Sequence, residues 1–295
     1  MKKLAIWGWW QGKNLGDNWI RHVLEDQFPG AFFIPTTERD FRPYGFVLCG
    51  GGGLFVRNMY APWLPPVTTP YGMLGIGAEF PHTDGLAVQI SEDARFFYAR
   101  DMYTLRCMNI FGRTPAYDVT FLAPAAAAAA GRDVAQATLI WREPGVLLQS
   151  DDFSSYIGPY APKEDWKKII SYYFPSIVED DFQYQTDWNP SGKIGNPFVI
   201  ISGRFHGVIA AIQMGIPCIG IDICPKIRAV MRDAKLEKYC LKIGDIAKLP
   251  EILRDLSINY EKIISLECVY AENAINNMRI IYREVKKIID EVLYV

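Results

Sequence analysis

The stretch FVIISGRFHGVIAAIQMGIPCIGIDICPK, residues 198–226, decides the fold class of this chain. It begins with an apolar run at 198–201, turns at Ser202 and Gly203, and continues as an apolar segment with helical spacing. After Gly215 a second short apolar run leads to Pro225 and Lys226. Apolar runs of strand length that alternate with helices are typical of parallel sheets covered on both faces. The stretch therefore predicts a strand, a helix and a second parallel strand.

The same alternation extends in both directions from this stretch. In the first half the pattern predicts strands at 4–10, 31–35, 46–49, 71–80 and 95–99, with helices at 17–27 and 102–111. In the second half it predicts strands at 138–141, 198–201, 217–221 and 239–243, helices at 163–173, 204–214, 225–233 and 249–256, and a last helix at 258–293. Alternation of this kind predicts an α/β fold with parallel sheets.

The chain is long enough for two domains. Its 295 residues exceed what one hydrophobic core usually serves. The alanine-rich segment at 123–131 has neither large apolar groups nor reactive side chains, which favours a linker over a short helix. We expect Rossmann-like domains at 1–131 and 132–295 that face a cleft, with the last helix packing back across them.

Composition and charge exclude several classes of protein. Thirty-one basic and 33 acidic residues provide no broad positive field for nucleic acid. The six cysteines lack the close pairing of zinc or redox motifs, and no run of residues suits a cleavable signal or a membrane span. We expect a cytoplasmic protein with reduced thiols, no metal and no cofactor.

An anion site is predicted at the start of the helix at 204–214. Arg204 and His206 stand in its first turn, where backbone N–H groups and the helix dipole favour an anion, and Gly207 follows them. Lys226 follows the next strand and adds a mobile positive charge. The alternative is a structural role for both side chains, in which Arg204 forms an ion pair with a nearby carboxylate and His206 packs in the interior or caps the helix. The convergence of three such groups favours a phosphate or carboxylate ligand.

A second set of polar groups follows the strands of the first half. Asn14 and Asp17 stand at the first strand–helix junction, where an amide and a carboxylate suit sugar hydroxyls, although Asp17 could instead cap its helix. Gly51 and Gly52 belong to a glycine run that suits close backbone packing as well as the approach of a ligand. Trp10 belongs to a tryptophan cluster that offers a stacking surface.

These motifs together resemble the polysaccharide pyruvyl transferases. The resemblance rests on N-L-G-D at 14–17, a strand followed by G-G-G-G-L-F at 50–55, A-R-D at 99–101, Asp118, S-G-R-F-H-G at 202–207, G-I-P at 215–217 and C-P-K-I-R at 224–228. It covers nearly the whole chain, and its most specific part is S-x-R-x-H followed by Lys226. Little of the segment 151–195 can be matched to the family.

The resemblance implies transfer of pyruvate from phosphoenolpyruvate to two hydroxyls of one sugar, in a glycosyltransferase-B-like fold. The products would be a cyclic ketal and inorganic phosphate. Our hypothesis for this reaction makes His206 the general acid and Asp17 a base or orienting group, while Arg204, Lys226, Arg100 and Gly207 bind phosphoenolpyruvate. Asn14, Gly51, Gly52 and Trp10 would contact the acceptor, a glycan or its lipid-linked precursor. A lipid-linked acceptor would bring the enzyme to the inner face of the membrane without insertion.

Two other functions remain open at the level of sequence. A glycosyltransferase of similar shape would bind the diphosphate of a nucleotide sugar near Arg204, but the apolar residues at 208–211 replace the carboxylate that many such enzymes carry there. A non-catalytic carbohydrate-binding protein would explain the 16 Tyr and 8 Trp. A carbohydrate-binding protein would not explain why cationic groups converge at the start of the helix at 204–214.

Overall fold

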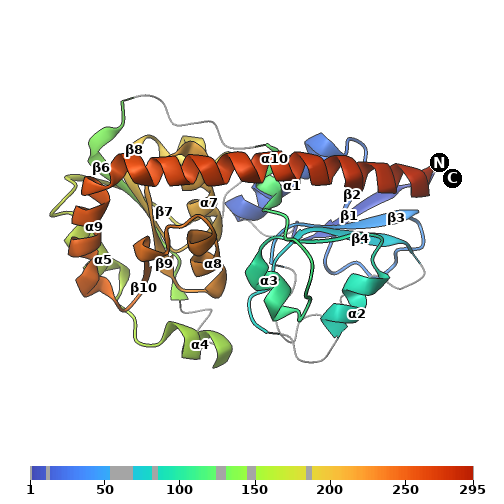
Figure 1. The fold of residues 1–295 in the computed structure, drawn as a ribbon, viewed down its shortest axis with the longest axis horizontal. Helices are drawn as coiled ribbons and strands as arrows, with labels where there is room; N and C mark the ends of the chain where they lie inside the picture. The colour runs from blue at the N-terminus through green and yellow to red at the C-terminus, as the bar shows by residue number, and fades with distance from the viewer. Residues whose placement is uncertain are drawn as a thin grey trace. The chain divides into compact units, whose positions relative to one another are not determined.

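The computed structural model describes residues 2–10, 14–53, 69–81, 86–123, 131–144, 151–183 and 188–294. The chain divides into two compact units. Unit 1 comprises Met1–Pro124, Tyr184–Trp188 and Asn273–Val295, and unit 2 comprises Ala125–Gln183 and Asn189–Glu272. Each unit contains one parallel five-stranded sheet with helices, so the predicted α/β fold is confirmed (Figure 1).

Unit 1 is built on the sheet β2-β1-β3-β4-β5. Its central strands β3 and β4 are buried at every residue, as expected for a parallel sheet covered on both faces. In chain order its elements are β1 (Leu4–Gly8), α1 (Leu15–Gln27), β2 (Phe32–Pro35), β3 (Phe46–Gly50), β4 (Tyr71–Ile76), α2 (Leu86–Asp93), β5 (Phe97–Ala99), α3 (Met102–Cys107) and the 3-10 helix η1 (Val119–Leu122).

Unit 2 is built on the sheet β10-β9-β8-β6-β7. Its elements are β6 (Asp133–Ile140), α4 (Asp151–Ile157), α5 (Lys163–Ile170), β7 (Ser176–Asp180), α6 (Ser191–Ile194), β8 (Pro197–Ser202), α7 (Phe205–Met214), β9 (Cys218–Asp222), α8 (Pro225–Asp233), η3 (Glu237–Tyr239), β10 (Cys240–Lys242), η4 (Ile246–Lys248), α9 (Leu249–Ile258) and α10 (Tyr260–Leu293). The strand–helix–strand predicted from 198–226 is β8, α7 and β9.

Both sheets have the same topology. In each unit the first strand along the chain lies between the second and the third: β1 between β2 and β3, and β6 between β7 and β8. The connections from the first strand therefore leave in opposite directions, and open α/β sheets bind ligands outside the carboxyl ends of the strands at such a switch point. The topology therefore predicts ligand-binding residues at the carboxyl ends of β1 and β3 in unit 1, and of β6 and β8 in unit 2.

The last helix contributes residues to both units. α10 has 34 residues, of which those before Asn273 belong to unit 2 and those from Asn273 onward to unit 1 (Figure 1). Within unit 1, Tyr282 donates a 2.7 Å hydrogen bond to the carbonyl of Gln27, and Met278 is fully buried. The division after Pro124 falls in the alanine-rich segment expected to join the domains, of which 124–130 lies outside the described residues.

Several elements were not predicted from the sequence: β7, α2, α4, α6 and the 3-10 helices η1, η3 and η4. β7 is an edge strand whose residues are exposed or half-buried and which ends in Glu179 and Asp180, so it lacks the apolar run of a buried strand. α2 is only eight residues long. β4 ends at Ile76, before the end of its predicted range, and Gly75 with a φ of 66° lies at a register irregularity between Leu74 and Ile76. Elements with weak apolar periodicity depend on tertiary pairing.

Candidate active site

The start of α7 is held by the side chain of Ser202. The Ser202 hydroxyl accepts a 3.0 Å hydrogen bond from the Arg204 backbone N–H and donates a 2.9 Å bond to the Arg204 carbonyl. These two bonds fix the turn between β8 and α7, with Arg204 in an extended conformation at the N-cap. Arg204 and His206 are half-buried at the carboxyl end of β8, where the sequence predicted them.

Gly207 allows α7 to begin this close to the sheet. A Cβ at this position would lie 2.3 Å from the Ser202 Oγ and 3.0 Å from the Ile140 Cδ1. The position that a Cβ of Gly207 would take is therefore already filled, in part by the Ser202 hydroxyl that hydrogen-bonds the Arg204 backbone. The pattern S-x-R-x-H-G thus has a local structural reason, in which Ser202 and Gly207 position the two side chains between them.

The starts of α7 and α8 have no side-chain cap, and the same is true of α5, α6 and α9 in unit 2. The N-cap of α7 is Arg204 and that of α8 is Cys224, and neither side chain hydrogen-bonds the first turn of its helix. Pro225 occupies the first turn of α8 and Lys226 follows it, half-buried. An uncapped helix start with a cationic side chain favours an anionic group.

Arg142 belongs with these cations, although it was not among the residues predicted for the site. Ile140, Ser202 and Gly220 are paired across the neighbouring strands β6, β8 and β9. Two residues further along these three segments are Arg142, Arg204 and Asp222, which therefore occupy equivalent positions in the register. The Gly203 N–H donates a 2.9 Å bond to the Ile140 carbonyl, and a Cβ on Gly203 would lie 3.7 Å from the Arg142 Cβ. The signal available beforehand was an arginine directly after a predicted strand.

The switch point of unit 1 carries an amide and a carboxylate. Asn14 caps α1, because its Oδ1 accepts a 2.9 Å bond from the Gly16 N–H. The Asn14 Nδ2 donates a 2.9 Å bond to the Asp17 Oδ2, and both side chains are half-buried. The cap of this helix is thus Asn14 rather than Asp17, and the Asp17 carboxylate lies beside it at the carboxyl end of β1.

The glycine run places backbone without side chains beside the Asp17 carboxylate. Gly51 and Gly52 have φ values of 70° and 76°, which side chains other than glycine rarely adopt. A Cβ on Gly52 would lie 3.8 Å from the Asp17 Oδ1. Trp10 is half-buried, donates a 3.0 Å bond to the Ile6 carbonyl and packs edge-on against Phe33. The predicted acceptor residues therefore gather at the ends of β1 and β3.

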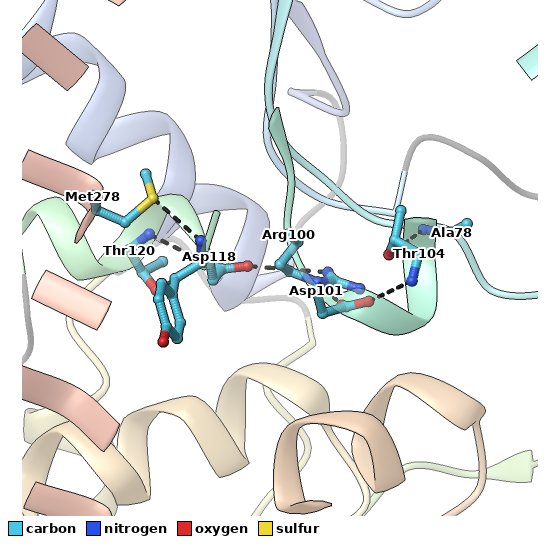
Figure 2. A network of polar contacts seen from close by, with 8 residues as sticks. Ala78, Arg100, Asp101, Thr104, Asp118, Thr120 and Met278 are labelled. Carbon is cyan, nitrogen blue, oxygen red and sulfur yellow. Dashed lines mark hydrogen bonds and ion pairs between the residues drawn. The ribbon is translucent and has the colours of Figure 1, made fainter. Parts of the chain in front are cut away.

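Arg100 is buried in unit 1 between carboxylates (Figure 2). Its Nε donates a 3.1 Å bond to the Asp101 Oδ2, and its Nη1 lies 4.0 Å from the Asp118 Oδ2. Burial opposes the positive charge, but the two carboxylates outweigh it and raise the pKa of the guanidinium above its ordinary value. The structure thus places Arg100 in a different unit from Arg204 and Lys226, and its donor contact remains a prediction.

The same carboxylates cap the helices at this end of unit 1. The Asp101 Oδ1 accepts a 2.6 Å bond from the Thr104 N–H at the start of α3, and the Asp118 Oδ1 accepts from the Thr120 N–H at the start of η1 (Figure 2). Unit 1 therefore presents helix starts already bound by its own amide and carboxylates. Unit 2 presents uncapped helix starts with cations.

Neither a metal centre nor a spanning helix is found in the described part of the chain. Its histidines, cysteines and carboxylates form no group of three that could hold a metal ion. None of the helices there combines the length and the apolar character needed to cross a bilayer.

Comparison with known proteins identifies the family. A family model described as polysaccharide pyruvyl transferase matches residues 14–225. The chain belongs to the polysaccharide pyruvyl transferase family. The match includes Asn14 and Asp17 at one end and the 202–207 motif near the other, so the resemblance seen in the sequence is confirmed. No curated protein matches this family member significantly in sequence.

Solved structures add a likeness in fold. This pyruvyl transferase family member superposes on the UDP-GlcNAc 2-epimerase from Neisseria meningitidis, solved with UDP-GlcNAc, with a TM-score of 0.51 and 10% identity, over 97% of this chain and 100% of the other. It also matches a functionally uncharacterised protein from Klebsiella pneumoniae with a TM-score of 0.45 and 14% identity, over 81% of this chain and 90% of the other. At these identities the epimerase likeness concerns the fold alone.

Proposed function

We propose that this pyruvyl transferase uses phosphoenolpyruvate to pyruvylate a sugar of a cell-surface glycan or of its lipid-linked precursor. The observation that supports this most directly is the contrast between the units. Unit 2 carries Arg142, Arg204 and Lys226 at uncapped helix starts and strand ends. Unit 1 carries Asn14 and Asp17 beside the glycine backbone at Gly51 and Gly52. An anionic donor suits the first set and a neutral, hydroxyl-rich acceptor suits the second.

Phosphoenolpyruvate explains why several cations are needed. It carries a phosphate and a carboxylate a few atoms apart, and each requires its own anchor. Arg204 and Arg142 offer planar guanidinium groups that can bind two oxygens at once, whereas Lys226 offers a single mobile charge. We assign the phosphate to the α7 start with Lys226, and the carboxylate to one of the two arginines.

The reaction requires an acid and a base. One sugar hydroxyl bonds to C2 of phosphoenolpyruvate while a proton is added to the methylene carbon, which becomes a methyl group. The C2–O bond to phosphate then breaks, and the second hydroxyl bonds to C2 as its proton is lost. We propose that His206 supplies the proton to the methylene carbon or to the departing phosphate, and that Asp17 accepts a hydroxyl proton. Arg204 and Lys226 stabilise the charge that develops on phosphate.

Thermal unfolding with and without phosphoenolpyruvate tests the donor without an acceptor in hand. A ligand that binds only the native state raises its stability by about 2.7 kcal/mol at a hundred times its Kd. We expect a rise in the thermal midpoint with phosphoenolpyruvate that exceeds the rise with inorganic phosphate, and no rise with a uridine nucleotide.

Variants of two arginines in unit 2 locate the site. Arg204→Ala should abolish the phosphoenolpyruvate shift. Arg254→Ala should keep it, because Arg254 is exposed on α9, far along the chain from the α7 start. A shift with the uridine nucleotide alone would instead favour a nucleotide-sugar glycosyltransferase, and a full shift in Arg204→Ala would refute the assignment of Arg204.

A further inference from the structure

A buried carboxylate connects two segments of unit 2 beside the cation site. Asp222, the last residue of β9, is fully buried. Its Oδ1 accepts a 2.6 Å hydrogen bond from the Tyr156 hydroxyl on α4. Its Oδ2 accepts a 2.7 Å bond from the Arg228 Nε on α8. Both carboxylate oxygens are therefore bound by side chains from different elements.

The tyrosine is itself fixed by its surroundings. Lys242 on β10 lies 5.4 Å from the centre of the Tyr156 ring, and its Nζ lies 3.4 Å from the Tyr156 carbonyl. Burial, followed by the adjacent Asp222 carboxylate, raises the pKa of the Tyr156 hydroxyl, so the hydroxyl keeps the proton that it donates. Arg228 also lies 3.5 Å from Glu237. The carboxylate thus lies within a connected polar network.

The two segments joined in this way are those that carry Arg142 and Lys226. Arg142 follows β6, and α4 with Tyr156 is the next α-helix in the described part of the chain. Lys226 and Arg228 both belong to the first turns of α8. In the sheet, β8 with Arg204 lies between β6 and β9. A bond from α4 to the end of β9 therefore connects the chain on either side of the α7 start.

We infer that Tyr156 and Asp222 are positioning residues for the donor: their hydrogen bond sets the spacing between the segments that carry Arg142 and Lys226. The inference rests on the proposed binding of phosphoenolpyruvate in unit 2. According to this inference, neither Tyr156 nor Asp222 contacts the donor. Their effect comes through the placement of the two cations, because a ligand with two anionic groups binds well only when its anchors are correctly spaced.

A matched pair of tyrosine variants separates positioning from general stability. Tyr239 also donates a short bond to an aspartate in unit 2, 2.7 Å to the Asp255 Oδ2, but on η3 and α9. Tyr156→Phe and Tyr239→Phe each remove one hydroxyl from such a bond. Isothermal titration of phosphoenolpyruvate into the full chain should give a Kd raised about tenfold for Tyr156→Phe and unchanged for Tyr239→Phe. Thermal midpoints without ligand should fall similarly in both variants.

Three results would count against the inference. An unchanged Kd in Tyr156→Phe would overturn it and leave the proposed function intact, provided that wild type binds phosphoenolpyruvate. An equal rise of the Kd in both variants would show a general loss of stability instead of positioning. Failure of the wild type to bind phosphoenolpyruvate would overturn the proposed function and this inference together. Asp222→Asn provides a second variant, for which the Kd should rise at least as far as in Tyr156→Phe.

Discussion

Replacing Gly207 with alanine tests how closely the start of α7 must approach β8. The added Cβ would lie 2.3 Å from the Ser202 Oγ, well inside the contact distance of non-bonded atoms. Either the hydroxyl rotates away or the helix moves off the sheet. Because this hydroxyl makes both hydrogen bonds to the Arg204 backbone, the first response breaks them. The second displaces Arg204 and His206 directly.

Two effects of opposite sign decide the free energy of unfolding. Alanine in place of glycine inside a helix stabilises it by about 1 kcal/mol. The loss of two hydrogen bonds costs about 1 kcal/mol each, and forcing an extra methyl group into a packed interior costs about 1–3 kcal/mol. The losses exceed the gain. We expect Gly207→Ala to lower the free energy of unfolding by about 2–4 kcal/mol.

Urea unfolding measures this change, with Gly192→Ala as the matched control. Gly192 lies in the helix α6, where an added Cβ would meet no atom within 4 Å, so this variant should be at least as stable as wild type. Adding Ser202→Ala to Gly207→Ala removes the closest contact, so the double variant should lose less than the two single variants combined. Wild-type stability in Gly207→Ala, or retention of its phosphoenolpyruvate shift, would refute the reasoning.

Three further predictions concern groups buried in the two units. Burial raises the pKa of the Glu267 carboxyl well above 4.5, so the native state holds a proton that the unfolded state releases. This stabilising contribution is complete below pH 4.5 and declines as pH rises toward the higher native pKa, by up to about 1.4 kcal/mol per pH unit. Glu267→Gln should remove this part of the decline in thermal midpoint, and parallel pH curves for variant and wild type would contradict it. Gly77→Ala would place a Cβ 2.3 Å from the Arg100 Nη2 and should cost about 2 kcal/mol in urea unfolding, whereas an unchanged midpoint would show that the guanidinium moves freely. Asp101→Ala removes the cap of α3 and a partner of buried Arg100, so it should cost about 3 kcal/mol, and a loss below about 1 kcal/mol would mean that Asp118 alone suffices.

The positions of the residues proposed for the donor were largely predictable because their signals are local. Ser202, Arg204, His206 and Gly207 lie within six consecutive residues, and their strand and helix follow from apolar runs of the right length. Lys226 follows the next strand, which pairs with β8 in the sheet. Parallel strands end at the same edge, so side chains just past neighbouring strands meet there. The family resemblance came from these same residues.

Arg142 and Arg100 show where local signals stop. Both are arginines directly after predicted strands, but only Arg100 was predicted to be a site residue. Arg142 became part of the cation set through the register that pairs Ile140 with Ser202, a contact between distant parts of the chain. Arg100 was found buried among carboxylates, one of which, Asp118, lies well beyond it in sequence. Neither the place of Arg142 among the cations nor the burial of Arg100 could be recognised from hydrophobic periodicity or from neighbouring residues.

The amino-acid sequence is enough to identify this chain as an α/β protein of the polysaccharide pyruvyl transferase family, with Arg204 and His206 at the start of a helix. Hydrophobic spacing and turn residues act over a few positions, so they can be recognised along the chain. Three features became visible only in the folded chain: the strand order that repeats in both units, the partners of Arg100 and the connection from Tyr156 through Asp222 to Arg228. These depend on which distant segments pair, and that choice is made by packing of the whole unit.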